Sequence, residues 1–507
     1  MKLAELLKGE DVGRIEGDAA VEITGLSYDS RETRDGHLFF ALARDEERNR
    51  AYIKDALNRG ARAVAVRRWD GGTARPAAAI VQCERPRLLM GAVAARFFNY
   101  PSERVDLIGI TGTSGKTTTT YLLASIFEAA GLGAGIIGTI GIFIRGRKIY
   151  HGLTTPESLD FESALAQMES AGVRHVAAEV SSIGLAEGRV DALNFRACLF
   201  TNFGRDHLDY HVTLDDYFAA KLRLFAEILP RSRRKETVAV ARGDEPYGRR
   251  VLESSIGRRV SFGLARSLDV YPQEFRADLS GIHGVMVALG KKIGFDSPLV
   301  GEFNLLNILG ASALSVALGI DADAVAEGVR RCPGAPGRME VVPSRPGVTV
   351  LVDYAHKPDA LEAVLRAVRP LTSGRIICVF GCGGDRDPGK RPIMGEIAGR
   401  LADLPMLTSD NPRSEDPLAI IAQVEKGLIA AGLERLDAPS AGARGYVIEP
   451  DRRTAIAAAL GSAVAGDVVI IAGKGHEDYQ LVGDRVLHFD DREVVRAVAA
   501  QLGGGQC

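Results

Sequence analysis

The stretch VDLIGITGTSGKTTTT, residues 105–120, sets the interpretation of the whole chain. Residues 105–111 predict a short apolar strand, residues 112–115 a tight glycine loop, and residues 116–131 a helix. A strand that turns through glycines into a helix N-terminus directs several backbone N–H groups, and the positive end of the helix dipole, toward one point. Such a loop favours the binding of a phosphate group.

Side chains of the loop add to this phosphate-binding potential. Lys116 supplies a mobile cation, and the hydroxyl of Thr117 can ligate a Mg²⁺ ion that is bound to phosphate. The ordinary Walker spacing would require a glycine at Ile110, so the loop is a shorter variant. A turn that only needed flexible residues would not usually place Lys-Thr directly after its last glycine. We therefore predict a nucleotide-phosphate site formed by Gly112, Thr113, Ser114, Gly115, Lys116, Thr117 and Thr118.

The composition of the chain indicates which kinds of ligand it binds and where in the cell it is located. The 507-residue chain carries 63 basic and 65 acidic residues, and no single-sign block resembles a nucleic-acid or membrane tail. Its six cysteines include no CxxC pair, which argues against a zinc site and a disulfide framework. The N-terminus is charged too early for a signal peptide, and residues 132–144 are too few to span a bilayer. We expect a cytoplasmic protein without membrane insertion that binds small molecules.

Strands and helices alternate in three successive segments. Residues 1–103 form a small segment, residues 104–336 contain the phosphate loop, and residues 337–507 form a third unit. Only between about 265 and 300 does the pattern become strand-only. Such alternation predicts right-handed crossovers and mostly parallel sheets. We predict an α/β protein with a small N-terminal α/β domain, a central P-loop domain with a mostly parallel sheet, and a C-terminal Rossmann-like α/β domain.

Polar residues gather where the predicted central strands end, which is where ligands bind in parallel sheets. Glu179 and His207 could supply a carboxylate and an imidazole to Mg²⁺ beside the phosphates, because Mg²⁺ keeps several waters and needs few protein ligands. An isolated histidine, however, is more often a hydrogen-bonded loop residue. Lys221 lies on an amphipathic helix and, by spacing alone, is a solvated lysine. The cluster 28–31 is, by itself, most simply a capped turn.

The combination of these features suggests a reaction type. The chain has a P-loop without a recognisable switch or kinase loop, and its later strand-end loops are rich in cationic residues. This combination suggests phosphoryl transfer to a substrate acid, after which an amine can attack the acyl phosphate. In such chemistry the protein mainly positions groups and neutralises charge.

The motifs of this chain, and their order, resemble those of the Mur ligases, which are ATP-dependent amide-forming enzymes of peptidoglycan precursor synthesis. The resemblance runs from Asp29 to about Gln480. It is carried by TGTSGKTTT, TTPES, EVSS, TNFGRDHLDYH, FAAKLRLF, GEFNLLN, PGRME, VDYAHKPDAL, FGCGGDRDPGKRPIM, SDNPRSEDP and AGKGHEDYQ. It implies addition of meso-2,6-diaminopimelate to the D-glutamyl γ-carboxylate of a UDP-muramoyl dipeptide, with ATP and two Mg²⁺ ions.

The resemblance also implies a role for each matching residue. Lys116, His207 and Lys221 would be catalytic. The metal ligands would be Thr117, Glu179, His207 and Lys221, the last as a carbamylated lysine whose new carboxylate binds the second Mg²⁺. Further ATP contacts would be Asn304, Asn307, Arg338, Asp353 and His356. Contacts to the UDP-linked substrate would be Ser30, Arg31, Thr154, Thr155, Ser182 and Arg189. The diaminopimelate contacts would be Arg386, Asp410, Asn411, Arg413, Gly473 and Glu477.

The choice of amino acid is the most specific implication. Members that take diaminopimelate carry Asp-Asn-Pro-Arg, here Asp410 to Arg413, whereas lysine-adding relatives lack that arginine. The distal end of diaminopimelate is a zwitterion, and an arginine fork binds a carboxylate bidentately. Glu477 is suited to the distal ammonium.

The chain departs from the family pattern in two places. Ile183 follows Ser182 where the family usually has histidine, and residues 43–49 replace a glycine and an Asp-Gly-His turn on the uridine side. A Mur-like ligase acting on a different acidic carrier is therefore one alternative. A non-catalytic nucleotide-binding scaffold is another alternative. A scaffold would not need the complete set of phosphate and metal residues that this chain has, namely Lys116, Glu179, His207 and Lys221. We expect a monomer with small-molecule substrates and no nucleic-acid partner.

Overall fold

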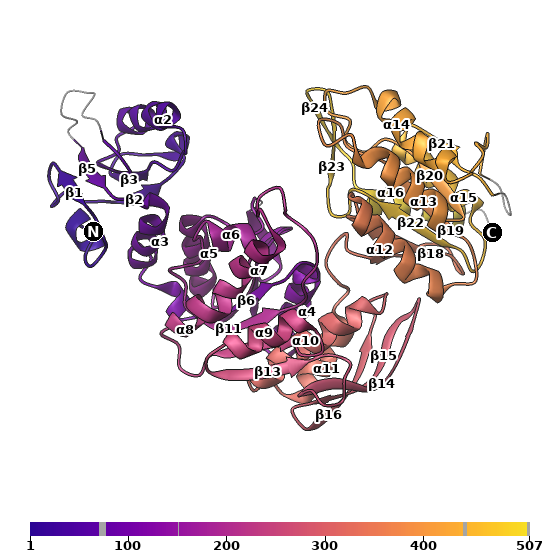
Figure 1. Cartoon of the computed structure of the whole chain (residues 1–507), viewed down its shortest axis with the longest axis horizontal. Helices are drawn as coiled ribbons and strands as arrows, with labels where there is room; N and C mark the ends of the chain where they lie inside the picture. The colour runs from indigo at the N-terminus through magenta and orange to yellow at the C-terminus, as the bar shows by residue number, and fades with distance from the viewer. Residues whose placement is uncertain (70–77, 151, 440–443, 504–507) are drawn as a thin grey trace. The chain divides into compact units, whose positions relative to one another are not determined.

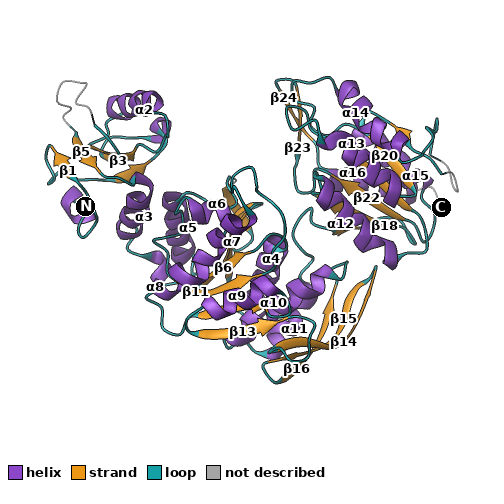
Figure 2. Cartoon of the chain, in the orientation of Figure 1, coloured by secondary structure: helices purple, strands orange, loops and turns teal. Residues whose placement is uncertain are grey.

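The computed structural model of the chain describes residues 1–69, 78–150, 152–439 and 444–503. Helices and strands alternate along it, which confirms the predicted α/β class (Figures 1 and 2). The chain forms two compact units. The first comprises Met1–Tyr271, Val287–Lys291 and Leu309–Gly328, and the second Pro272–Met286, Lys292–Ile308 and Val329–Cys507. Within the described ranges, no helix combines the length and apolar character needed to cross a membrane.

A five-stranded sheet begins the first unit. Its order is β1-β5-β4-β3-β2, with β2 to β5 parallel and β1 antiparallel at the edge. The strands are β1 (Arg14–Glu16), β2 (Gly25–Ser27), β3 (His37–Phe40), β4 (Ala63–Val66) and β5 (Ala79–Gln82). The helices are α1 (Leu3–Leu6), α2 (Glu46–Asn58) and α3 (Pro86–Phe97), with short 3₁₀ turns at Ser30–Glu32 and Pro101–Glu103. The carboxyl ends of β3, β4 and β5 therefore meet at one edge.

The central sheet of the first unit is built around β6 (Asp106–Thr111). The strands β13-β12-β11-β6-β10-β7 are parallel neighbours, which confirms the mostly parallel sheet. Their bounds are β7 (Ala134–Gly138), β10 (His175–Glu179), β11 (Phe195–Phe200), β12 (Val238–Arg242) and β13 (Arg258–Phe262). An antiparallel hairpin, β8 (Gly141–Ile144) and β9 (Arg147–Tyr150), extends the β7 edge.

Helices cover this sheet where the sequence predicts crossovers. They are α4 (Lys116–Ala129), α5 (Ser158–Ser170), α6 (Ser182–Ala186), α7 (Leu214–Arg223), α8 (Leu229–Arg231) and α9 (Pro246–Ser254). The amphipathic helix predicted to carry Lys221 is α7, which is followed by a π-helical turn at Leu224–Ile228. The strand-only stretch is confirmed as β14 (Val270–Asp278), β15 (Gly281–Ala288) and β16 (Lys291–Ser297), after which come α10 (Phe303–Ala317) and α11 (Ala322–Arg331).

The second unit contains a six-stranded sheet of order β17-β18-β22-β19-β20-β21, parallel except for β17. Its strands are β17 (Glu340–Val342), β18 (Thr349–Asp353), β19 (Ile376–Phe380), β20 (Leu404–Leu407), β21 (Val447–Ile448) and β22 (Val468–Ala472). Its helices are α12 (Pro358–Val368), α13 (Lys390–Leu401), α14 (Pro417–Ala430), α15 (Arg452–Ser462) and α16 (Asp491–Gly503), with a 3₁₀ turn at Arg369–Leu371. A separate hairpin joins β23 (Tyr479–Val482) to β24 (Arg485–His488).

Both faces of the second sheet are covered. Alternate residues of β19 enter two different cores: Ile376, Cys378 and Phe380 pack with α12, α13 and α14, whereas Ile377 and Val379 pack with α15 and α16. Strands buried on both faces have continuous apolar sequences, which is the pattern the sequence shows here. The five described cysteines are buried and free, and Cys507 lies outside the described residues.

Candidate active site

The phosphate loop joins β6 to α4, as predicted. Gly112 has φ 144°, and a Cβ at this position would clash with Thr201 Oγ1. Gly115 has φ 83° and is the N-cap of α4. Both glycines adopt backbone conformations that other residues rarely take. The loop geometry therefore explains why the sequence needs glycine on each side of Thr113 and Ser114.

A second loop, which follows β11, holds the phosphate loop in place. Thr113 N donates to Asn202 O at 3.0 Å, and Ser114 N donates to Asn202 Oδ1 at 2.9 Å. Thr201 Oγ1 donates to Ser114 O at 2.6 Å. Thr201 and Asn202 are not among the predicted site residues, although their position at the end of the strand beside β6 is a usable signal.

Two lysines converge on one carbonyl oxygen of the loop. Lys116 Nζ donates to Gly112 O at 2.9 Å and to Thr113 O at 3.0 Å, and Lys221 Nζ donates to the same Gly112 O at 2.8 Å. Lys221 is only 1% exposed, so the expectation of a solvated lysine is wrong. Burial lowers the pKa of Lys221 well below its usual value, and the charge of Lys116 lowers it further. The structure therefore makes Lys221 a buried amine beside a cation.

The local structure of α7 explains why Lys221 is buried. Thr213 caps the helix, because its hydroxyl accepts from Asp216 N while the Asp216 carboxylate accepts from Thr213 N. From this start the helix directs Tyr217, Phe218 and Lys221 to its buried face. Lys221 Nζ lies 4.5 Å from the centre of the Tyr217 ring. A lysine within an otherwise apolar face is not distinguishable by helical period alone.

Glu179 is a buried carboxylate beside the start of α4. It is 1% exposed, and its Oε2 accepts hydrogen bonds from Thr117 Oγ1 and Thr139 Oγ1, each at 3.1 Å. Thr139 N donates to its Oε1 at 2.9 Å. Among the described residues, no group of three or more His, Cys, Asp or Glu side chains could hold a metal ion. One carboxylate and one hydroxyl nevertheless fit Mg²⁺, which is commonly bound by one or two carboxylates, phosphates and waters.

His207 lies in the loop that follows β11. Its backbone has φ 54°, and its side chain is 37% exposed with Nε2 3.5 Å from Asp206 Oδ2. The His207 ring lies 6.0 Å from the ring of Tyr217, whose hydroxyl is 3.2 Å from Thr113 Oγ1. The predicted metal ligand is thus placed on the side of the phosphate loop that Tyr217 contacts.

The predicted contacts to the central part of the substrate gather around the end of β10. Thr155 Oγ1 donates to Glu179 O at 2.9 Å, and Arg189 Nη1 donates to Thr155 O at 3.1 Å. Thr154 Oγ1 is 3.1 Å from Thr139 Oγ1. Ser182 begins α6, and its buried hydroxyl has no hydrogen-bond partner in the described structure. Thr155 and Arg189 are thus linked to the backbone at the end of β10, and Thr154 to the threonine that binds the Glu179 carboxylate.

A cavity of about 1300 Å³ lies within the first unit, between the ends of β3, β4 and β5 and the residues around α6. Arginines outnumber carboxylates among the described residues that line it. The arginines are Arg44, Arg50, Arg67, Arg68, Arg85, Arg87 and Arg223. The divergent segment 43–49 contributes four lining residues: Ala43, Arg44, Glu46 and Asn49. The cavity is therefore suited to a large, negatively charged ligand.

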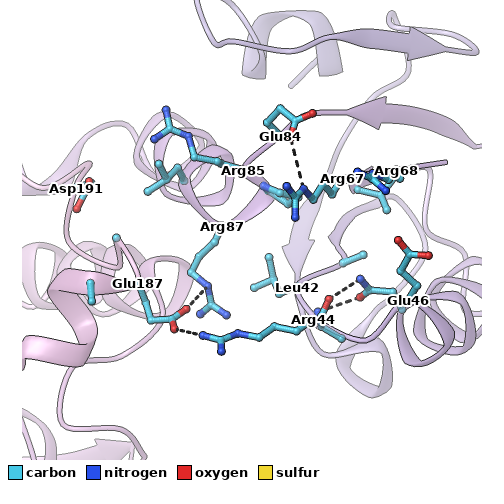
Figure 3. Close-up of a pocket in the computed structure, with 18 of the residues that line it drawn as sticks. Leu42, Arg44, Glu46, Arg67, Arg68, Glu84, Arg85, Arg87, Glu187 and Asp191 are labelled. Carbon is cyan, nitrogen blue, oxygen red and sulfur yellow. Dashed lines mark hydrogen bonds and ion pairs between the residues drawn. The ribbon is translucent and has the colours of Figure 1, made fainter. Parts of the chain in front are cut away.

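Glu187 lies at the cavity, where Arg44 and Arg87 both point toward its carboxylate (Figure 3). Arg44 Nη2 lies 2.8 Å from its Oε1 and Arg87 Nε lies 3.3 Å from its Oε2. The Tyr210 hydroxyl also donates to Oε1 at 2.7 Å. Arg87 also pairs with Glu157, which lies 3.2 Å from Arg189 Nε. A chain of alternating charges thus runs from the N-terminal sheet to a predicted substrate contact.

Ser30 and Arg31 do not line the cavity. Ser30 is buried in the 3₁₀ turn after β2, and Arg31 donates to both oxygens of Asp29. The structure therefore shows the capped turn that the residues alone suggest, and the role of these two residues in substrate binding stays a prediction.

The predicted nucleotide residues of the second unit form two groups. Asn304 and Asn307 are hydrogen-bonded to each other at 2.8 Å in the first turns of α10. The guanidinium of Arg338 lies 4.9 Å from the Tyr354 ring, which also packs against His356. The buried Asp353 accepts hydrogen bonds from Met339 N at 2.7 Å and Ala355 N at 2.8 Å. Burial raises the pKa of Asp353 and lowers that of His356.

The predicted amino-acid residues meet at the ends of β20 and β22. We call Asp410, Asn411, Arg413 and Glu477 the strand-end cluster. Asn411 Nδ2 donates to Glu477 Oε2 at 2.9 Å. Arg413 has φ 52°, and its Nη1 donates to Gly384 O at 2.8 Å. Its Nε and Nη2 have no hydrogen-bond partner in the described part of the chain.

The remaining two predicted residues flank this cluster. Gly473 has φ 119°, and a Cβ there would crowd Asp410 Oδ2. Arg386 is exposed, and its Nη1 donates to Asp385 O at 3.1 Å. Arg386 and Arg413 both approach Gly383. The structure therefore brings the predicted amino-acid residues together, with Arg386 at the rim.

Two family models and full-length relatives match this chain. Residues 110–315 match the Mur ligase middle domain, and residues 337–475 match the glutamate ligase domain of Mur ligases. The chain is 43% identical over 505 residues to the UDP-N-acetylmuramoyl-L-alanyl-D-glutamate--2,6-diaminopimelate ligase of Geobacter sulfurreducens, with 99% of this chain and 98% of that protein covered.

Solved structures show the same relationship. A UDP-N-acetylmuramoyl-L-alanyl-D-glutamate--2,6-diaminopimelate ligase superposes with a TM-score of 0.71 at 32% identity, covering 99% of each chain. The MurF ligase of Thermotoga maritima, solved with ADP, shares the fold with a TM-score of 0.58 at 17% identity over 96% of this chain and 99% of that chain. Together, the domain matches and the full-length relatives place this chain in the Mur ligase family.

Proposed function

We propose that this chain uses ATP to join meso-2,6-diaminopimelate to the γ-carboxylate of the D-glutamyl residue of UDP-N-acetylmuramoyl-L-alanyl-D-glutamate, a step of peptidoglycan precursor synthesis. The observation that carries the proposal is the pair of lysines on Gly112 O beside the buried carboxylate of Glu179. A non-catalytic nucleotide scaffold has no need for this arrangement. The full-length relatives with this activity support the choice of substrates.

The proposed reaction has two steps. The γ-carboxylate oxygen attacks the γ-phosphorus of ATP and displaces ADP, which gives an acyl phosphate. The diaminopimelate amine then attacks the acyl carbon, phosphate leaves, and the amine loses a proton. Lys116 and the loop N–H groups hold the phosphates and offset the charge that develops on the transferred group. Thr117, Glu179, His207 and carbamylated Lys221 would hold two Mg²⁺ ions, which supply further charge neutralisation.

Lys221 is suited to carbamylation. Its buried site beside Lys116 lowers its pKa, so more of it is the neutral amine that can attack CO₂. The amine nitrogen forms a bond to carbon, and one proton is released, which leaves an N-linked carboxylate. This product places an anion near the cation of Lys116 and supplies an oxygen ligand of the kind that Mg²⁺ prefers.

The arginine-lined cavity is the proposed site for the carrier end of the substrate. A diphosphate carries charges that guanidinium groups bind bidentately. Because segment 43–49 lines this cavity and departs from the family pattern, a Mur-like ligase with a different acidic carrier is the second candidate. The contacts of Ser30 and Arg31, the cytoplasmic location and the monomeric state remain predictions.

The strand-end cluster is the proposed site for the amino acid. The Nε and Nη2 groups of Arg413 can bind the distal carboxylate of diaminopimelate, and Glu477 can accept from the distal ammonium. L-Lysine lacks the distal carboxylate and would leave the Arg413 fork without its partner.

The test is an assay of ADP release by the purified protein with the UDP-muramoyl dipeptide, ATP and Mg²⁺. We expect release that depends on meso-diaminopimelate and exceeds release with L-lysine. Several acidic carriers linked to UDP would be compared in parallel. No diaminopimelate-dependent release with the dipeptide would refute the proposal, and release with another carrier would establish the second candidate.

A further inference from the structure

Lys474 is a fully buried lysine that none of the roles above uses. It lies between Gly473 and Gly475 in the loop after β22, and it is 0% exposed. Burying an ammonium is costly unless hydrogen-bond acceptors surround it. Lys474 Nζ lies 3.4 Å from Asn411 Oδ1 and 3.2 Å from Glu477 Oε2, and it also donates to the carbonyl oxygen of Tyr479. An ammonium has three N–H donors, so these three acceptors satisfy it.

These contacts fix the orientation of two predicted amino-acid ligands. Leu481 N donates to Asn411 Oδ1 at 3.0 Å, which sets the amide so that its Nδ2 faces Glu477. Glu477 Oε2 consequently accepts from both Asn411 Nδ2 and Lys474 Nζ. Glu477 Oε1 has no hydrogen-bond partner in the described residues, and the Glu477 side chain is 15% exposed.

We propose that Lys474 is a positioning residue for the amino-acid substrate. It ties down one carboxylate oxygen of Glu477, with the amide of Asn411, and leaves Oε1 in a fixed place to accept from the substrate ammonium. The identity of that substrate as diaminopimelate rests on the proposed function. Lys474 acts through Glu477 and Asn411 and does not itself contact the substrate.

The first test replaces Lys474 by Met, which is unbranched and apolar and therefore suits a buried site. We expect Lys474→Met to raise the KM for diaminopimelate by about tenfold or more. Without Lys474, Glu477 is no longer held in place to accept from the substrate ammonium, and a hydrogen bond between charged groups typically contributes at least this factor to binding. The KM values for ATP and for the UDP-linked substrate should change less than about twofold. The matched control is Lys426→Met at an exposed lysine of α14, which should leave all three KM values unchanged.

A double-mutant cycle separates positioning from a general loss of structure. If Lys474 acts through Glu477, Lys474→Met should raise the KM for diaminopimelate far less in a Glu477→Gln background than in the wild type. An equal factor in both backgrounds, or a parallel rise in the KM values of all three substrates, would overturn the inference. Should thermal unfolding show that Lys474→Met is misfolded, Lys474→Gln replaces it with the same expected split.

The two proposals fail in different ways. A wild-type protein that shows no diaminopimelate-dependent ADP release would overturn the proposed function. An active wild type, combined with an unchanged KM for diaminopimelate in folded Lys474→Met, would overturn only the positioning role.

Discussion

Replacing Arg413 tests the most specific part of the proposed amino-acid site. Arg413 Nη1 is occupied by Gly384 O at 2.8 Å, whereas Nε and Nη2 have no partner in the described residues. We expect these two groups to bind the distal carboxylate of diaminopimelate. Hydrogen bonds to a charged group contribute about 1.5–3 kcal/mol each, so the pair would contribute about 3–6 kcal/mol. Arg413→Ala should therefore lower kcat/KM for diaminopimelate roughly 10²- to 10⁴-fold.

Arg413→Lys provides an intermediate case. A lysine can keep one charged hydrogen bond but not the bidentate pair, so the loss should be about 1.5–3 kcal/mol, or roughly 10- to 100-fold. The assay measures initial rates of ADP release against diaminopimelate at saturating ATP and UDP-linked substrate. Arg400→Ala, at a 64% exposed arginine of α13, is the matched control and should leave kcat/KM unchanged. An Arg413→Ala variant with wild-type kcat/KM would refute the assignment of the carboxylate to this fork.

Three further perturbations test other parts of the structure. Lys221→Ala should lose most activity and recover part of it when short carboxylic acids are added to the assay; full activity without them would exclude a carbamate role. Gly112→Ala should abolish ATP binding, measured by calorimetry, because the new methyl group would clash with Thr201 Oγ1 and the φ of 144° is strained for alanine; normal affinity would contradict this. Burial raises the pKa of Glu162 to about 8, so this group favours the folded state below pH 4.5 and the advantage is lost as the pH rises through 8. Glu162→Gln should remove this loss, giving a Tm above that of the wild type at pH 8.5; an equal Tm would refute it.

Local pattern was sufficient to predict much of the fold. The unit formed by β6, the glycine loop and α4 can be predicted from apolar residues, two glycines and Lys-Thr that lie within 16 positions of one another. All of this information is local in the sequence. The strands of the second sheet are apolar on both faces, which marks them as buried parallel strands. By contrast, the β8–β9 hairpin lies in a glycine-rich stretch whose composition did not identify strands.

The candidate site shows where local pattern stops being informative. Asn202 supports the phosphate loop from a loop 88 residues away in the sequence, and only the pairing of β11 with β6 brings it there. The contact of Lys221 with Gly112 O forms because α7 packs one of its faces against the same loop. Arg44, Arg67 and Arg85 follow three different strands, and Arg223 lies on α7, so the grouping of the cavity arginines requires the tertiary arrangement. Long-range pairing decides each of these roles.

The two buried lysines of the proposed site illustrate how surroundings determine the chemistry of one side chain. Lys221 is buried beside the cation of Lys116 and donates to Gly112 O, so its pKa falls and it becomes a candidate for reaction with CO₂. Lys474 has a carboxylate and two further acceptors, so its three N–H groups are occupied and it can hold other side chains in place. Both residues are lysines between small or apolar neighbours in the sequence, which does not separate them. The difference lies in the groups around each amine: the fold brings Gly112 to Lys221 from 109 residues away, whereas Glu477 and Tyr479 closely follow Lys474 and only Asn411 comes from a distant segment.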